Sequence, residues 1–72
     1  MNKSIMAQKL RALRGKRTQA EVAAAVGITT SAYAMYEQGE RIPRDDTKVR
    51  LANYFNQSIN FIFFDDNTHF EL

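Results

Sequence analysis

The side chains that could bind a ligand here are mainly those of Lys and Arg, and they are unevenly distributed along the sequence. All ten Lys and Arg residues lie within residues 1–50, against five acids, which gives this part a charge of +5. Residues 51–72 hold three acids and no Lys or Arg, while the first 17 residues hold six bases and no acid. A basic face backed by an acidic tail is typical of an oriented polyanion binder. The alternative is that these cations only solvate helix faces, and charge alone does not separate the two.

Other chemistry has little support in the sequence. The chain has no cysteine, which excludes a disulfide and a cysteine–zinc site and fits a reducing cytosol. His69 is the only histidine and a poor metal ligand, and Asp65 with Asp66 is interpreted as a solvated turn rather than a catalytic pair. We therefore expect no metal, no cofactor and no enzyme activity. No segment approaches the roughly 20 apolar residues of a membrane span, and the N-terminus lacks the apolar region of a signal peptide.

Two short helices joined by a tight turn occupy the middle of the sequence. The stretch 18–21, Thr-Gln-Ala-Glu, is a capping box that begins one helix, and Gly27 ends it in a left-handed conformation. Thr29 caps a second helix over 30–38, which Gly39 ends in the same manner. Helices this close in sequence must cross steeply, so one can lie across phosphates while the other enters the major groove of DNA.

Three further helices flank this pair, over 4–14, from about 45 to 55, and over 59–63. The expected caps are Ser4, Asp45 or Asp46, and Ser58, and Asn56 is expected in a left-handed position. The expected core consists of Met6, Leu10, Leu13, Val22, Ala23, Val26, Val49, Leu51, Ala52, Phe55, Ile59 and Ile62. The sequence therefore predicts an all-α domain of five short helices over 1–64, followed by a short C-terminal tail over 65–72 that is either loose or one short strand.

With these elements in place, the sequence resembles the Cro/repressor-type helix-turn-helix family. The resemblance rests on the joint spacing of 13–14 (Leu-Arg), 18–23 (Thr-Gln-Ala-Glu-Val-Ala), 26–29 (Val-Gly-Ile-Thr) and 36–39 (Tyr-Glu-Gln-Gly), with Arg41 and Pro43, and it covers roughly residues 5–64. It implies a lambda-repressor-like bundle and a cytoplasmic role in transcriptional regulation in bacteria or their phages, commonly as a homodimer on a palindromic operator. We therefore expect no small-molecule effector domain.

The resemblance also assigns contacts to double-stranded DNA. Residues on the outward face of the second helix of the motif, expected at base edges, are Thr30, Ser31, Ala34 and Met35. Residues expected at phosphates are Thr18, Gln19, Tyr36, Arg41 and Arg44, with Lys16 and Arg17 contacting or steering the backbone. Tyr33 matches a core position of the family, and Tyr36 matches a partly exposed aromatic.

One acid of the motif has an architectural role in the family. Glu37 is expected to pair with Arg14, with Arg11 as the second choice, because a buried unpaired carboxylate would be costly. The sequence also departs from the family pattern. The connection between the first two helices is about two residues shorter, and Asn56 and Gln57 replace a glycine and a valine, which predicts a less tightly seated fifth helix. The reading face lacks the Arg, Asn or Gln that makes bidentate base contacts, which favours readout of methyl groups and DNA shape.

The C-terminal end is rich in apolar side chains for so small a chain. Phe61, Phe64, Phe70 and Leu72 are interpreted as a dimerisation patch, and the alternative is that they fold back over the core. The sequence therefore predicts a sequence-specific DNA-binding regulator, most simply a repressor. The alternatives are an antitoxin or other partner-binding regulator of the same fold, whose tail orders on binding, and a nonspecific nucleoid-type binder with a steep salt dependence.

Overall fold

The computed structural model describes residues 1–67, and all of its regular elements are helical. They are α1 (Lys3–Arg14), α2 (Gln19–Val26), α3 (Thr30–Glu37), α4 (Asp45–Phe55) and a five-residue π-helix, η1 (Asn60–Phe64). Within the described residues there is no strand, so the five-helix, all-α architecture is as predicted. No helix in this part of the chain is long and apolar enough to cross a membrane.

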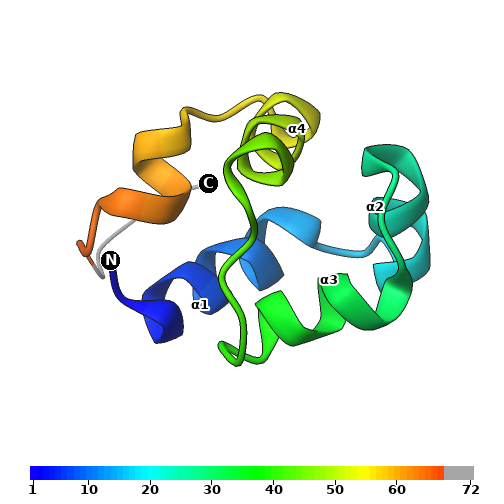
Figure 1. Cartoon of the computed structure of the whole chain (residues 1–72), viewed down its shortest axis with the longest axis horizontal. Coiled ribbons are helices and arrows are strands. Elements are labelled where there is room, and N and C mark those ends of the chain that lie inside the picture. Colours follow the sequence, from blue (N-terminus) through cyan, green and yellow to red (C-terminus); the bar gives the residue numbers. More distant parts are fainter. Residues whose placement is uncertain (68–72) are drawn as a thin grey trace.

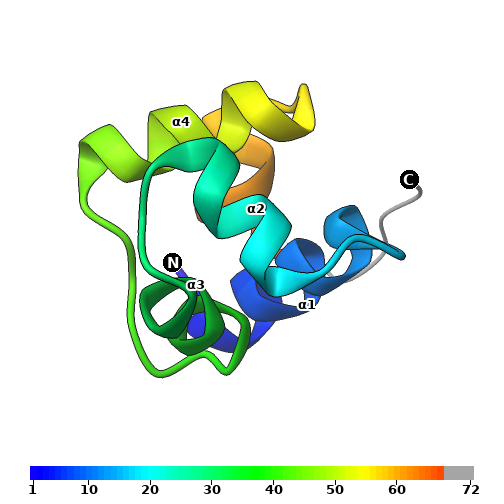
Figure 2. The same ribbon diagram turned by 90° about the vertical axis from the view of Figure 1, so that its right-hand side faces the viewer.

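The helices enclose a single core in a body of 28 × 22 × 19 Å. Helix α1 packs against α3 and η1, while α2 packs against α3 and α4 (Figure 1). The connection over 38–44 runs along one side of the molecule from α3 to α4 (Figure 2). The buried side chains of the core come from every helix: Met6, Leu10, Val22, Ala23, Val26, Tyr33, Tyr36, Leu51, Ala52, Phe55, Ile62 and Phe63. Leu13 and Ile59 pack against this core from half-buried positions.

The ends of α2 and α3 are fixed locally, as the sequence predicts. Thr18 Oγ1 accepts a hydrogen bond from the Glu21 amide at 3.0 Å, and Thr29 Oγ1 accepts one from the Ala32 amide at 3.1 Å. Within residues 1–67, this bond to Thr18 is the only one of the two capping-box hydrogen bonds that forms, and the Glu21 carboxylate does not bind the Thr18 amide. Gly27 has a φ of +73°, a conformation that a side chain would strain, so the turn between the two helices requires glycine there.

The N-terminal caps of α1 and α4 differ from the prediction. Asn2, not Ser4, caps α1: its side-chain oxygen accepts from the Ile5 amide at 3.0 Å, because the helix begins one residue earlier than expected. Helix α4 begins at Asp45 itself, so neither Asp45 nor Asp46 is its cap. The two acids lie instead in the first turn, where the positive end of the helix dipole stabilises negative charge.

Val49 was wrongly assigned to the core. Its side chain is 42% exposed, because the buried stripe of α4 runs through Lys48, Leu51, Ala52 and Phe55. These positions recur at helical spacing, and residue 49 falls about 100° away from the first of them.

The last helix lies one residue later than predicted and is a π-helix. The Asp65 amide donates to the Asn60 carbonyl at 2.7 Å, which is the five-residue hydrogen bond of that geometry. Ser58 Oγ accepts from the Phe61 amide at 3.0 Å, and Ile62 is buried, both as expected. Asn56 adopts the predicted left-handed conformation, with a φ of 54°.

A buried cation holds this last segment against α1. Lys9 is fully buried, and its Nζ donates to the carbonyls of Phe61, at 2.7 Å, and Asp65. The Asn2 amide adds a hydrogen bond of 3.0 Å to the Asp66 carboxylate. The N-terminus and the end of η1 therefore lie side by side (Figure 1).

Candidate nucleic-acid interface

The outward face of α3 is open to solvent. Thr30 and Ser31 are exposed, and Ala34 and Met35 are half-buried at its margin. Tyr33 and Glu37 occupy the opposite face, where both are buried against the other helices. The four residues predicted at base edges thus share one accessible surface, and none of them is needed for the core.

Glu37, at the end of α3, is the centre of a charged network. Arg14 binds its carboxylate with two donors, Nε to Oε2 at 2.7 Å and Nη2 to Oε1 at 3.1 Å. Gln19 Nε2 donates to Oε1 at 3.0 Å, and Arg11 Nη1 donates to the Glu37 main-chain carbonyl. The predicted ion pair with Arg14 is confirmed, and the second-choice partner, Arg11, binds the main chain instead. The network ties α1, the start of α2 and the end of α3 together.

Burial and hydrogen bonding have opposite effects on the pKa of Glu37. Burial alone would raise the pKa of the Glu37 carboxyl, but hydrogen bonds from the Arg14 guanidinium and the Gln19 amide outweigh it and hold that pKa below its usual value. Burial, with the nearby Glu37 carboxylate, raises the pKa of the Tyr33 phenol far above its usual range. Within residues 1–67 the Tyr33 hydroxyl is buried and makes no hydrogen bond of normal geometry. Glu37 is therefore ionised, and its role is to position helices.

Two residues predicted to contact phosphates have other surroundings in the structure: Tyr36 lies in the core, and Arg17 binds main-chain carbonyls. Tyr36 is only 9% exposed and belongs to the core, because it follows Tyr33 by three residues and shares its inward face. This corrects the expectation of a partly exposed aromatic. Arg17 donates to the carbonyls of Leu13, at 2.7 Å, and Arg14, at 3.2 Å, so it caps the end of α1. Its guanidinium also lies 5.1 Å from the ring centre of Tyr54.

The remaining predicted phosphate contacts are accessible. Thr18 is exposed at the start of α2, although its hydroxyl oxygen accepts the capping bond. Gln19 gives one amide hydrogen to Glu37, and a side-chain amide has a second. Lys16, Arg41 and Arg44 are exposed, and Arg44 Nε lies 3.8 Å from a carboxylate oxygen of Asp46, which is also exposed.

Most of the cations are already hydrogen-bonded inside the domain. Six of the ten Lys and Arg residues make hydrogen bonds to main-chain carbonyls or carboxylates inside the domain: Lys9, Arg11, Arg14, Arg17, Lys48 and Arg50. Lys3, Lys16, Arg41 and Arg44 remain as exposed cations without such a hydrogen bond in the described part of the chain. Lys3 was not among the predicted contacts.

Arg50 is a positioning residue that sequence reasoning missed. Its Nη1 donates to the Val26 carbonyl at 2.9 Å, at the end of α2, and Nη2 lies within 3.4 Å of the Asp46 carboxylate. A side chain at Gly27 would bring its Cβ within 3.2 Å of the same guanidinium. Arg50 thus holds the helix-turn-helix against α4. No sequence signal marks it, because its main partner is a carbonyl 24 positions away.

The predicted dimerisation residues are only partly described. Phe61 is half-buried against the core, with Lys9 Nζ 4.5 Å from its ring centre. Phe64 is 51% exposed, and Lys48 Nζ lies 5.0 Å from its ring centre. Phe70 and Leu72 lie outside the described residues.

This fold and site define a helical DNA-binding module. A helix-turn-helix family model matches residues 8–62, and the chain belongs to that family, of the Cro/repressor type. A solved structure with the same fold is the solution structure of the SOS-response transcriptional repressor LexA from Eubacterium rectale, with a TM-score of 0.84 and 25% sequence identity. The match covers 99% of this chain and 78% of that one. No curated protein sequence matches the chain significantly. The protein is a DNA-binding transcriptional regulator.

Proposed function

We propose that this protein is a sequence-specific repressor that binds a palindromic operator as a homodimer in the bacterial cytoplasm, with α3 in the major groove. The observation that carries the proposal is the accessible face of α3, formed by Thr30, Ser31, Ala34 and Met35. The Glu37 network fixes the opposite side of the same helix to α1 and α2. A rigid helix with one free face is what major-groove recognition requires.

The chemistry of that face favours a particular kind of readout. Thr30 and Ser31 offer single hydroxyl groups, while Ala34 and Met35 offer apolar contacts suited to thymine methyl groups. Specificity then rests on methyl contacts and DNA deformability more than on bidentate hydrogen bonds. Thr18, Gln19, Lys16, Arg41 and Arg44 would hold the phosphates on either side, and repression would follow from occupying the operator.

Dimerisation would place two copies of α3 on successive turns of one face of the duplex, about 34 Å apart. Phe64, 51% exposed at the end of η1, is the described residue best suited to a two-fold apolar contact. Phe61, which is half-buried against the core, would add to this contact. Sedimentation with and without operator DNA tests this: Phe64→Ser should weaken dimerisation, and a wild-type monomer on DNA would contradict it.

Selection of bound duplexes from a random pool tests the function. We expect one palindromic consensus without a guanine requirement read by α3. Ser31→Ala should alter preference at one base pair, whereas Arg41→Gln should weaken binding to all sequences alike. Gln8→Ala, on the exposed side of α1, is the control and should change neither property. Equal affinity for every duplex would indicate a nonspecific binder, and no DNA binding would leave the partner-binding alternative.

A further inference from the structure

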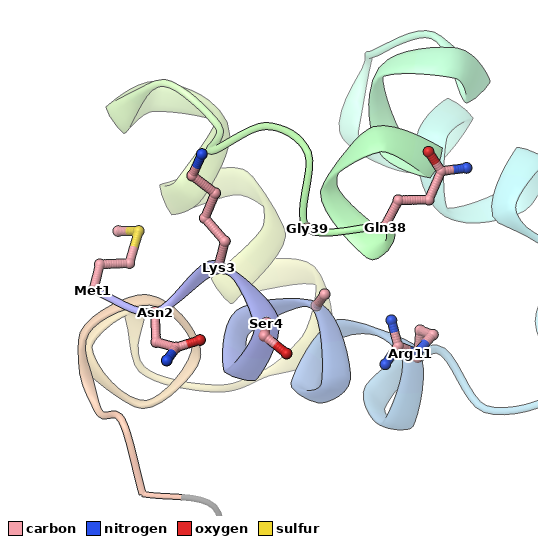
Figure 3. A pocket seen from close by; sticks show the side chains of 8 residues that line it. Met1, Asn2, Lys3, Ser4, Arg11, Gln38 and Gly39 are labelled. Atoms are coloured by element: carbon pink, nitrogen blue, oxygen red, sulfur yellow. The ribbon is translucent and has the colours of Figure 1, made fainter.

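A cleft lies between the first turns of α1 and the end of α3, with a volume of about 680 Å³. Its lining includes Lys3, Ser4, Ala7 and Arg11 from α1, and Gln38 and Gly39 from the end of α3. Figure 3 shows the side chains of Lys3, Arg11 and Gln38 around it. Gly39 allows the close approach of the two segments, because a Cβ there would lie 3.3 Å from the Lys3 carbonyl oxygen. The cleft is thus a fixed feature of the α1–α3 packing.

The cleft continues the reading face of α3. Gln38 follows Ala34 by four residues and Met35 by three, so it shares the face on which they lie. Eight helical residues span roughly 12 Å, and the major groove is about 12 Å wide. When α3 lies in the groove, the cleft beside its last residues faces the same side of the molecule, where a backbone phosphate bordering the groove can approach it.

The charges of the cleft suit an anion. Lys3 is exposed and forms no ion pair in the described part of the chain. Arg11 uses one donor on the Glu37 carbonyl, and a guanidinium has five. The Gln38 side chain is exposed and adds a neutral donor. No acidic side chain is among the residues that line the cleft within residues 1–67.

We propose that this cleft binds a backbone phosphate of the duplex at the edge of the groove occupied by α3. Lys3 donates to the phosphate, and Arg11 supplies further positive charge. This inference rests on the proposed function and adds α1 to the DNA-contacting elements, next to the basic connection that carries Arg41 and Arg44.

The test compares two substitutions on α1 that change the net charge equally. Lys3→Gln removes the cleft's ammonium group, whereas Gln8→Glu lowers the charge by one on an exposed position outside the cleft. Affinity for the selected operator is measured across a salt series for both variants and the wild type. The slope of log affinity against log salt is negative, and Lys3→Gln should reduce its magnitude by about 0.9 per protomer. Between about 50 and 200 mM salt, the wild-type advantage per protomer should then shrink roughly 3.5-fold.

Phosphate ethylation interference supplies the positional readout. One interfering phosphate at the groove edge should disappear with Lys3→Gln and persist with Gln8→Glu. Thermal melting of each variant shows whether the fold is intact. Equal slopes and unchanged interference for Lys3→Gln and Gln8→Glu would overturn the inference while leaving the proposed function standing.

Inorganic phosphate without DNA separates the duplex from a small anion. Titration up to millimolar concentrations should leave the amide NMR signals of Lys3, Gln38 and Gly39 unchanged. Saturable shifts would instead assign the cleft to a free anion and overturn the backbone contact. If the wild type binds no duplex specifically, the proposed function and this inference fail together.

Discussion

Two regions of this molecule each bury a charged side chain, and they satisfy it differently. At the α1–α2–α3 junction, the Glu37 carboxylate is bound by the side chains of Arg14 and Gln19. At the α1–η1 junction, the Lys9 ammonium is bound by the main-chain carbonyls of Phe61 and Asp65. The first site joins α1 to the two helices that contact DNA in the proposed function, and the second fastens the C-terminal segment to α1.

The difference lies in what each site constrains. Side-chain partners fix the identity of both residues, so removing one leaves a specific charge unpaired. Main-chain partners fix only a position, because every residue has a carbonyl. The Glu37 site is therefore sensitive to partner identity, whereas the Lys9 site is sensitive mainly to the backbone path of η1.

The largest expected effect comes from removing a side-chain partner. Arg14→Met leaves the Glu37 carboxylate, whose side chain is 2% exposed, without its ion pair. We expect the free energy of unfolding to fall by about 3 kcal/mol, measured by urea denaturation. The control is Arg14→Met with Glu37→Leu, which removes both charges and should recover much of the loss. If the double variant is as unstable as the single one, the loss of stability comes from lost packing and not from the unpaired charge.

Removing the cation of the second site should have a smaller effect. Lys9→Met keeps the apolar stem but leaves the carbonyls of Phe61 and Asp65 without that donor, which we expect to cost about 2 kcal/mol. Gln8→Met, at the exposed neighbouring position, controls for the substitution itself. Amide exchange should accelerate in η1 and not in α3. Equal acceleration in both helices would contradict the separation of the two sites.

Acid should weaken the first site in a defined direction. Because the pKa of Glu37 is lowered by folding from its usual 4.5, its contribution to stability is fully present above that value. It is lost as the pH falls below 4.5 and through the lower, folded-state pKa. The free energy of unfolding, measured with urea across this pH range, should decline as the pH falls, and it should decline less in Glu37→Gln. The same slope in both proteins would assign the decline to other carboxylates.

The smallest effect is expected at the hydroxyl beside Glu37. Tyr33→Phe removes a buried oxygen that has no hydrogen-bond partner of normal geometry in residues 1–67. Stability should change by less than about 0.5 kcal/mol, since no hydrogen bond is lost. A loss of about 1 kcal/mol or more, measured by thermal melting, would show that the hydroxyl donates to the Glu37 carboxylate.

The local features of the helix-turn-helix were predictable from the sequence. Thr18, Gly27, Thr29 and Gly39 mark the ends of α2 and α3 through caps and left-handed positions that depend on neighbouring residues alone. Family resemblance added the pairing of Arg14 with Glu37, which the structure contains. The assignment of base and phosphate contacts remains a prediction, because it concerns DNA.

The errors arose where a residue's surroundings come from distant parts of the chain. Val49 has an apolar side chain but falls outside the buried stripe of α4, and Tyr36 is buried because α3 turns it inward. The cations show the same limit. Lys9, Arg17 and Arg50 look like ordinary basic residues, yet each binds carbonyls whose positions depend on the packing of helices.

The sequence by itself determined the helical class, the ends of the two motif helices and the family, because these depend on local residue chemistry and spacing. Only the tertiary structure decided which cations remain available to DNA and that Lys3 borders a cleft at the end of the reading helix. The physical reason is that a main-chain carbonyl carries no residue identity. Whether a cation binds a main-chain carbonyl or stays available to a phosphate therefore depends on where the folded backbone places the carbonyl.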